Sequence, residues 1–165
     1  MIVCGVDPGS RATGYAVLDI GASGDHYVAH GTIRPKSGAL PGRLCHIYRE
    51  IETVLTRFAP EEMALESSFY AKNAQTAMKL GQVRGVIILA ASLMDIPVFE
   101  YTPTEVKMAT CGYGHADKEQ VNAMITTILH LEKGFVRSRD ASDALAIGVC
   151  HSSSRLMRIM REKQG

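Results

Sequence analysis

The spacing of hydrophobic residues changes part-way along the chain, and this change constrains the fold more than any other feature. Three short segments with the apolar runs expected of β-strands come first, at Met1–Val6, Gly14–Ile20 and His26–Ile33. From Leu44 onward the apolar residues follow a helical period instead, which predicts an amphipathic helix over Arg43–Phe58. A three-stranded antiparallel start followed by a helix points to an α/β chain.

Helices and strands alternate through the rest of the chain. Two further strands are predicted at Met63–Glu66 and Pro97–Tyr101. Four more helices are predicted, at about Asn73 to Met94, Pro103–Thr110, Lys118–Leu131, and from near Asp140 to about Lys163. The order β-β-β-α-β-α-β-α-α-α is that of an RNase H-like fold, with a five-stranded mixed sheet flanked by helices. We expect the 165 residues to form a single domain over residues 1–165.

Composition and charge narrow the class of protein. The formal net charge of +1 is a weak sign of nucleic-acid binding, but residues 67–94 contain lysine and arginine and no acidic residue. This basic stretch fits either a solvated face or a phosphate-binding one. No apolar run approaches the ~20 residues of a membrane span. The four scattered cysteines favour a reducing compartment over disulfides or a zinc site, so we expect a cytoplasmic protein.

Four carboxylates occupy positions from which they can converge. Asp7 follows the first strand directly and Glu66 ends a later one, and the ends of neighbouring strands form the crevice where α/β proteins bind ligands. Asp140 and Asp143 are three residues apart at the start of the last helix, so they share one face of it. Oxygen ligands without cysteine or histidine favour Mg²⁺ or Mn²⁺ over zinc, and two such ions suit phosphodiester hydrolysis.

Each of these carboxylates also has a structural interpretation. Asp140 and Asp143 could cap the last helix and complement its dipole, and Asp7 could be a turn residue before Pro-Gly. Glu66 is harder to explain in this way, because it places a carboxylate at the end of a buried apolar strand. The residue pattern alone leaves both interpretations open.

Five motifs in order give the chain a resemblance to the RuvC family of bacterial Holliday-junction resolvases. The motifs are Gly5–Tyr15, Glu66–Ala77 with its continuation Leu80–Gly85, Tyr101–Lys107, Ala116–Val121 and Asp140–Ala146. The resemblance covers essentially the full chain, and five motifs in order are far more specific than any one of them. Two departures are Val83, where the family commonly has alanine, and Cys111 in the loop between Lys107 and Lys118.

The resemblance implies a function that the residue pattern alone does not give. It implies an endonuclease that cuts four-way DNA junctions by paired symmetric nicks, leaving 5′-phosphate and 3′-hydroxyl ends, in homologous recombination and DNA repair. It also implies two Mg²⁺ ions per subunit, with Mn²⁺ able to substitute, and a homodimer that matches the two-fold symmetry of the junction. A branch-migration motor complex of RuvA and RuvB is implied as a partner.

The resemblance assigns roles to particular residues. Metal binding and catalysis are carried over onto the four carboxylates, of which Asp140 is the least strict because some relatives have histidine there. DNA contact is carried over onto Phe69, Lys107 and Lys118. Without the resemblance, both lysines would be read as solvated or locally paired side chains. Phe69 fits a wedge that stacks on a base at the crossover, or an aromatic ring that closes over the core.

Two other functions are compatible with parts of the sequence. Asp-x-Gly after a strand also occurs in ATP-binding proteins of the actin and sugar-kinase group, but those proteins need a second such domain. A junction-binding protein without enzymatic activity could keep the fold, but it would not need all four carboxylates. We therefore predict an active nuclease.

Overall fold

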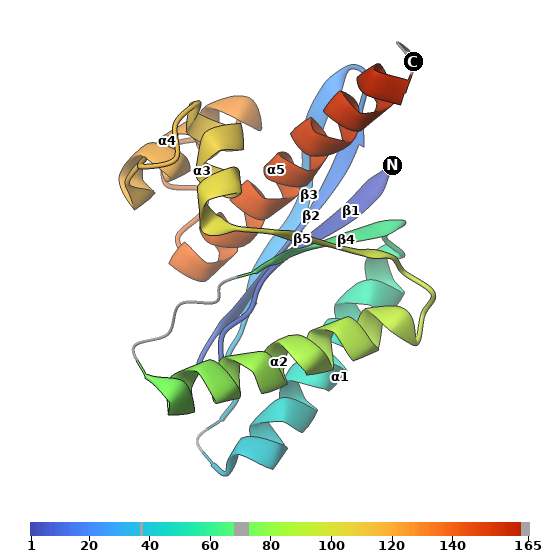
Figure 1. Cartoon of the computed structure of the whole chain (residues 1–165), viewed down its shortest axis with the longest axis vertical. Coiled ribbons are helices and arrows are strands. Elements are labelled where there is room, and N and C mark those ends of the chain that lie inside the picture. Colours follow the sequence, from blue (N-terminus) through green and yellow to red (C-terminus); the bar gives the residue numbers. More distant parts are fainter. Residues whose placement is uncertain (37, 68–72, 163–165) are drawn as a thin grey trace.

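A central sheet organises the computed structural model, which describes residues 1–36, 38–67 and 73–162, with side chains of the last helix described through Met157 (Figure 1). Within that part of the chain the sheet has five strands in the order β3-β2-β1-β4-β5. The strands are β1 (Ile2–Asp7), β2 (Thr13–Gly21), β3 (Gly24–Ile33), β4 (Glu62–Glu66) and β5 (Val98–Tyr101). β1, β2 and β3 pair antiparallel, whereas β4 and β5 run parallel to β1. The predicted five-stranded mixed sheet is confirmed.

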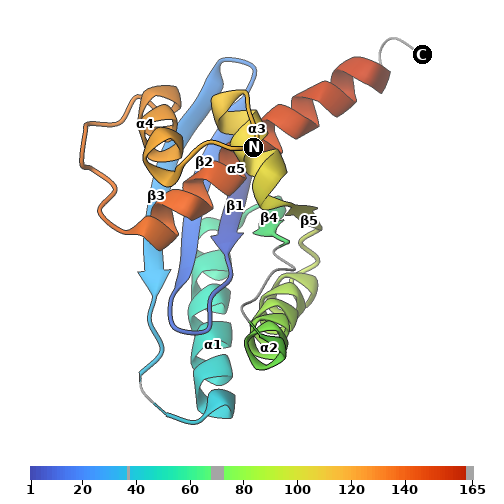
Figure 2. The same ribbon diagram turned by 60° about the vertical axis from the view of Figure 1, so that its left-hand side comes forward.

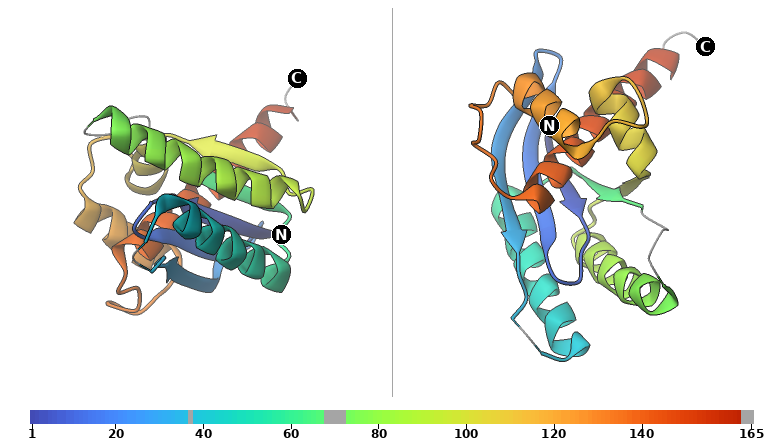
Figure 3. Two further views of the ribbon diagram at one scale, coloured as in Figure 1. Left: turned by 90° about the horizontal axis from the view of Figure 1, so that it is seen from below. Right: turned by 90° about the vertical axis from the view of Figure 1, so that its left-hand side faces the viewer.

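Helices cover both faces of this sheet. The helices are α1 (Leu40–Phe58), α2 (Ala74–Ser92), α3 (Pro103–Cys111), α4 (Lys118–Ile128) and α5 (Arg139–Glu162). α1 and α2 lie side by side on one face, and α3, α4 and α5 cover the other (Figures 1 and 3). α5 crosses β1 and β2 obliquely, and its C-terminal part extends beyond the sheet (Figure 2).

Two hydrophobic clusters fill the layers. Under α1 and α2, apolar side chains from alternate positions of the central strands, such as Val6 and Leu65, pack against Ile47, Ile51 and Ile87. The opposite face packs against α5 and the two short helices. The central strands are therefore buried on both sides, which explains why β1 and β4 read as unbroken apolar runs in the sequence.

The element boundaries agree with the sequence prediction to within a few residues, and the differences have local causes. α1 begins at Leu40, earlier than predicted, because Pro41 lies in its first turn, where proline is tolerated. α4 ends at Ile128 rather than Leu131, and His130 follows with a left-handed backbone (φ 51°) that stops the helix. Asp7 belongs to β1 itself rather than to the turn after it.

A search of the described helices finds none that is both long enough and apolar enough to cross a membrane.

Candidate active site

Asp7 and Glu66 lie next to each other at one edge of the sheet. β1 and β4 pair in parallel with Val6 opposite Leu65, so the next residue of each strand is the carboxylate. Side chains along a strand point alternately to the two faces of the sheet. Gly5 and Ala64, two positions before Asp7 and Glu66, lie on the face that α5 covers. Both carboxylates therefore project from the sheet on the side that α5 covers.

α5 brings the other two carboxylates to the same place. Asp140 lies in its first turn and Asp143 follows three residues later, on the same helical face. The helix lies very close to the sheet, since a Cβ on Gly14 would collide with the backbone carbonyl oxygen of Asp140, and one on Gly5 with that of Ala144. Gly14 pairs directly with Asp7 in the sheet. These two glycines let the start of α5 lie over the end of β1.

Two cationic side chains contact the carboxylates of α5. Lys118, the first residue of α4, places its Nζ 2.6 Å from Asp143 Oδ2, and Arg34 Nη2 lies 3.5 Å from Asp140 Oδ2. On the other side of the sheet, Arg84 of α2 donates hydrogen bonds to the backbone oxygen of Glu66 and to Glu100 Oε1. Arginine and lysine thus hold the strand end and the helix start that carry the acids.

The other three carboxylates are close enough to Asp7 to affect its ionisation. Burial, followed by the negative charges of Glu66 and Asp143, raises the pKa of Asp7 from 3.8 to about 8, and Asp140 adds to the increase. Lys118 acts in the opposite direction on the pKa of Asp7. The Asp143 hydrogen bond in turn raises the pKa of Lys118. A carboxylate that is buried beside other negative charges marks a site that can receive positive charge.

Two hollows flank the carboxylates. One, of about 240 Å³, is lined by Glu66, Lys107, Lys118 and Asp143 together with apolar residues of α3, α4 and α5. A larger one, of about 630 Å³, opens between α4 and the start of α5 and shares Lys118 and Asp143 with the first. Lys107 and Lys118, predicted from separate motifs, are therefore on one surface with two of the acids.

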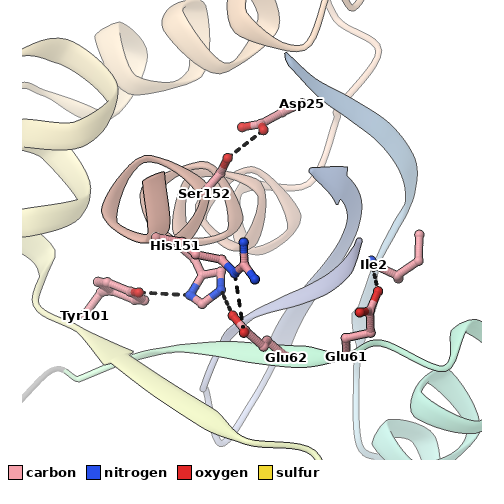
Figure 4. Close-up of polar contacts among 8 residues, drawn as sticks. Ile2, Asp25, Glu61, Glu62, Tyr101, His151 and Ser152 are labelled. Carbon is pink, nitrogen blue, oxygen red and sulfur yellow. Dashed lines mark hydrogen bonds and ion pairs between the residues drawn. The ribbon is translucent and has the colours of Figure 1, made fainter. Parts of the chain in front are cut away.

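A buried polar network holds the middle of α5 (Figure 4). His151 is fully buried; its Nδ1 lies 2.9 Å from the Tyr101 hydroxyl and its Nε2 lies 2.6 Å from Glu62 Oε2. Arg155 Nε reaches the other oxygen of Glu62 at 3.5 Å, and Ser152 Oγ donates to Asp25 Oδ1 at 2.6 Å. These bonds join α5 to β3, β4 and β5, and so fix the direction in which the helix presents Asp140 and Asp143.

The family model for crossover junction endodeoxyribonuclease RuvC matches residues 3–151. The chain belongs to the RuvC family. It is 44% identical over 164 residues to the crossover junction endodeoxyribonuclease RuvC of Chromohalobacter salexigens, covering 99% of this chain and 87% of that protein. It is 47% identical over 160 residues to the RuvC of Photorhabdus laumondii, covering 96% of this chain and 91% of that protein.

Solved RuvC structures have the same architecture. The chain is similar to Thermus thermophilus RuvC with a TM-score of 0.86 and 34% identity, covering 95% of this chain and 96% of that one. It is similar to the T. thermophilus RuvC chain in complex with Holliday junction substrate with a TM-score of 0.86, 29% identity and the same coverage. The RNase H-like fold predicted from the element order is thereby confirmed.

The donor set suits a hard divalent cation. The four side chains offer only carboxylate oxygens, and burial together with the neighbouring negative charges raises the pKa of Asp7, a cost that a cation would offset. Within residues 1–36, 38–67 and 73–162, no three Asp, Glu, His or Cys side chains already form a ready coordination cage. Lys118 and Arg34 instead hold the outer carboxylates. The residues of this RuvC-family site therefore fit a metal ion by type and charge.

Six of the predicted site residues, the four acids and the two lysines, lie at this end of the sheet. Phe69 falls outside the described residues. Arg34 was not singled out from the sequence. The signal was available, because β3 pairs antiparallel with β2 and so ends beside the carboxylates, with Arg34 as the next residue.

Proposed function

We propose that this protein is a structure-selective endonuclease that resolves four-way (Holliday) DNA junctions in recombination and repair. One observation carries the proposal: in a chain of the RuvC family, Asp7 and Glu66 end neighbouring strands beneath the helix that presents Asp140 and Asp143. A RuvC chain of the same architecture is described in complex with Holliday junction substrate, which supports the same ligand here.

Membership in this nuclease family implies dependence on a divalent metal. We propose Mg²⁺ as that metal, two ions per subunit, with Mn²⁺ able to substitute and with Asp7, Glu66, Asp140 and Asp143 as the ligands. When bound, such ions supply a water of lowered pKa and compensate the charge of the leaving oxygen. The all-carboxylate donor set and the mutual repulsion around Asp7 support this assignment.

The side chains around the acids would position the DNA for hydrolysis. Lys107 and Lys118 line the same hollow as Glu66 and Asp143, where their charges would hold phosphates of the cut strand. A water oxygen attacks the phosphorus in line, the bond to the 3′ oxygen breaks, and that oxygen takes up a proton. The products are a 5′-phosphate and a 3′-hydroxyl, and no covalent enzyme intermediate forms.

A cleavage assay on a four-way junction and on a linear duplex of the same sequence tests the proposal. We expect junction-selective paired nicks with Mg²⁺ or Mn²⁺, and near-background cleavage with Ca²⁺, whose looser geometry aligns the reactants poorly. Asp7→Asn should retain junction binding and lose cleavage. Binding without cleavage by the unaltered protein would indicate a non-enzymatic junction binder, and ATP binding without either would indicate the kinase-like alternative.

We further propose a homodimer that uses the outer face of α2. Met78, Gly81, Gly85, Leu89 and Leu93 recur every three or four residues along this helix and its C-terminal cap, and all are exposed. A Cβ on either glycine would meet nothing within 4 Å, so a second helix could approach closely. Leu89→Glu should yield a monomer by sedimentation and remove paired nicking; a strict monomer that still makes paired nicks would refute the dimer.

Three finer proposals rest on the sequence, either on its cysteine usage or on the resemblance. We propose that the dimer works with the RuvA–RuvB branch-migration complex and that it acts in the cytoplasm. We also propose that Phe69 stacks on a base at the crossover, where such stacking is worth ~1–3 kcal/mol. Fluorescence of 2-aminopurine at the crossover should rise on binding, and Phe69→Ala should abolish the rise. If Phe69→Ala instead lowers thermal stability and leaves cleavage intact, Phe69 belongs to the core.

A further inference from the structure

A strip of positive charge leads away from the carboxylates along the end of β3 and onto α1. The sequence has no acidic residue from His26 to Arg49. Because β3 ends level with β1, with β2 between them, this stretch emerges at the active-site end of the sheet, where Arg34 contacts Asp140. The chain then continues through Lys36 to the start of α1. Basic residues, with no acidic residue among them in the sequence, therefore lie both at the active site and at the start of α1.

The strip ends in a hollow with basic walls. A hollow of about 510 Å³ at the start of α1 is lined by Lys36, Arg43, His46 and Arg49, and no acidic residue lines it. We name these four residues the α1 patch. None of them takes part in an ion pair with another described residue. Glu50 and Glu52 follow along the helix, but neither belongs to the walls of the hollow.

The positive charge of the α1 patch favours a polyanionic ligand. Two arginines and a lysine around one concavity repel each other, and phosphate oxygens are the partners that relieve such repulsion with charge-assisted hydrogen bonds. The N–H groups of the first turn of α1, which no side chain caps, add to this field without being needed for it. Continuity with Arg34 and the carboxylates indicates that the polyanion is the strand that enters the active site.

We propose that the α1 patch binds backbone phosphates of a junction arm, outside the site of cleavage, and so contributes affinity and arm orientation without taking part in the chemistry. The identity of the ligand rests on the proposed function. Since phosphate contacts fix register but do not read bases, the patch should be indifferent to DNA sequence. The competing interpretation is a solvated basic face that touches nothing.

The test compares the double variant Arg43→Gln/Arg49→Gln with the matched variant Arg57→Gln, which removes an arginine from the last turn of the same helix. All are made in the full chain carrying Asp7→Asn, so that junction affinity is measured with Mg²⁺ and without cleavage. We expect the plot of log affinity against log salt to become shallower by about 0.9 for each lost contact, hence about 2 for the double variant. Affinity at physiological salt should fall roughly fivefold per contact. Arg57→Gln should change neither quantity.

Junctions with progressively shortened arms give the second readout. The difference in affinity between the protein with and without Arg43 and Arg49 should disappear once the arms no longer reach the α1 patch. In the cleaving protein, the double variant should raise KM and leave kcat at saturation unchanged.

Several results would overturn the proposal. An unchanged salt slope, an equal loss in Arg57→Gln, a loss that persists on the shortest arms, or a lower kcat at saturation would each do so. Arg49→Gln alone, on an exposed side chain, serves if the double variant folds poorly, and it should lose about half of the slope change. Failure of the nuclease assignment would appear separately, as absent cleavage by the unaltered protein, because the patch is measured through binding.

Discussion

Replacing Asp7 with asparagine is expected to stabilise the metal-free protein at pH 8 while abolishing cleavage. Burial and the charges of Glu66 and Asp143 raise the pKa of Asp7 from 3.8 to about 8 in the folded protein. Between these pH values the folded state retains a proton that the unfolded chain has released. The free energy of unfolding therefore falls as the pH rises from about 4 to about 8, and it is unaffected by Asp7 below that window.

The size of the effect follows from the change in pKa. A difference of about four pKa units corresponds to about 6 kcal/mol at about 1.4 kcal/mol per unit. Because Asp7 keeps partial contact with solvent, we expect on the order of 2–4 kcal/mol of this to appear as a difference in stability. Asparagine has the shape of the protonated acid and does not titrate, so it escapes the penalty.

Urea denaturation in EDTA over a series of pH values measures this difference directly. The advantage of Asp7→Asn should be small at low pH, grow through the window and level off above pH 8, and Mg²⁺ should reduce it by stabilising the unaltered protein. Asp19→Asn is the control, and it should change the free energy of unfolding in the opposite direction. The N-terminal amine 2.7 Å away lowers the pKa of Asp19, so the ionised carboxylate is the favoured form there. A variant no more stable than the unaltered protein at pH 8, or an advantage independent of pH, would refute the reasoning.

Three further substitutions test the site and its support. Gly14→Ala should push α5 off the sheet and remove cleavage. Gly21→Ala is the control, because a Cβ there meets open space, and it should remain active in the same assay. Equal activities would show that cleavage does not require α5 to lie close to β2. Lys118→Ala should weaken cleavage and flatten its salt dependence, and no change in either would make it an ordinary surface lysine. His151→Leu should lower the free energy of unfolding by about 2–4 kcal/mol in urea, because it removes the buried hydrogen bonds of His151 to Glu62 and Tyr101; a loss below about 1 kcal/mol would show that the network is dispensable.

The order of elements could be predicted because each has a strong local signal. The short apolar runs of the first strands and the helical period after Leu44 depend only on neighbouring residues, and both predicted the right element. The helix starts and ends were less predictable. Leu40–Gly42 has little helical character of its own, yet the helix includes it because Pro41 is tolerated in the first turn.

The candidate site was predictable as far as the strand ends and helix faces define it. Asp7 and Glu66 follow from two parallel strands, and Asp140 and Asp143 from a spacing of three. The contact between Arg34 and Asp140 joins residues 106 positions apart, so it depends on strand register and on how α5 lies across the sheet. The antiparallel start of the chain places Arg34 at this end of the sheet, but the spacing of neighbouring residues does not encode its contact with Asp140. The hollow that brings Lys107 beside Glu66 likewise depends on the packing of α3 and α4.

Because α5 is anchored at a distance from the carboxylates, a small tilt of the helix moves them by a large amount. Asp140 and His151 are eleven residues apart, so the bonds of His151 hold the helix about 16 Å from the carboxylates. A tilt of only about 4° around that anchor would displace Asp140 by about 1 Å, and misplacement on that scale can cost about a hundredfold in rate. Loosening this mid-helix anchor, by moderate heat or by a change at Glu62, should therefore inactivate the protein well before it unfolds.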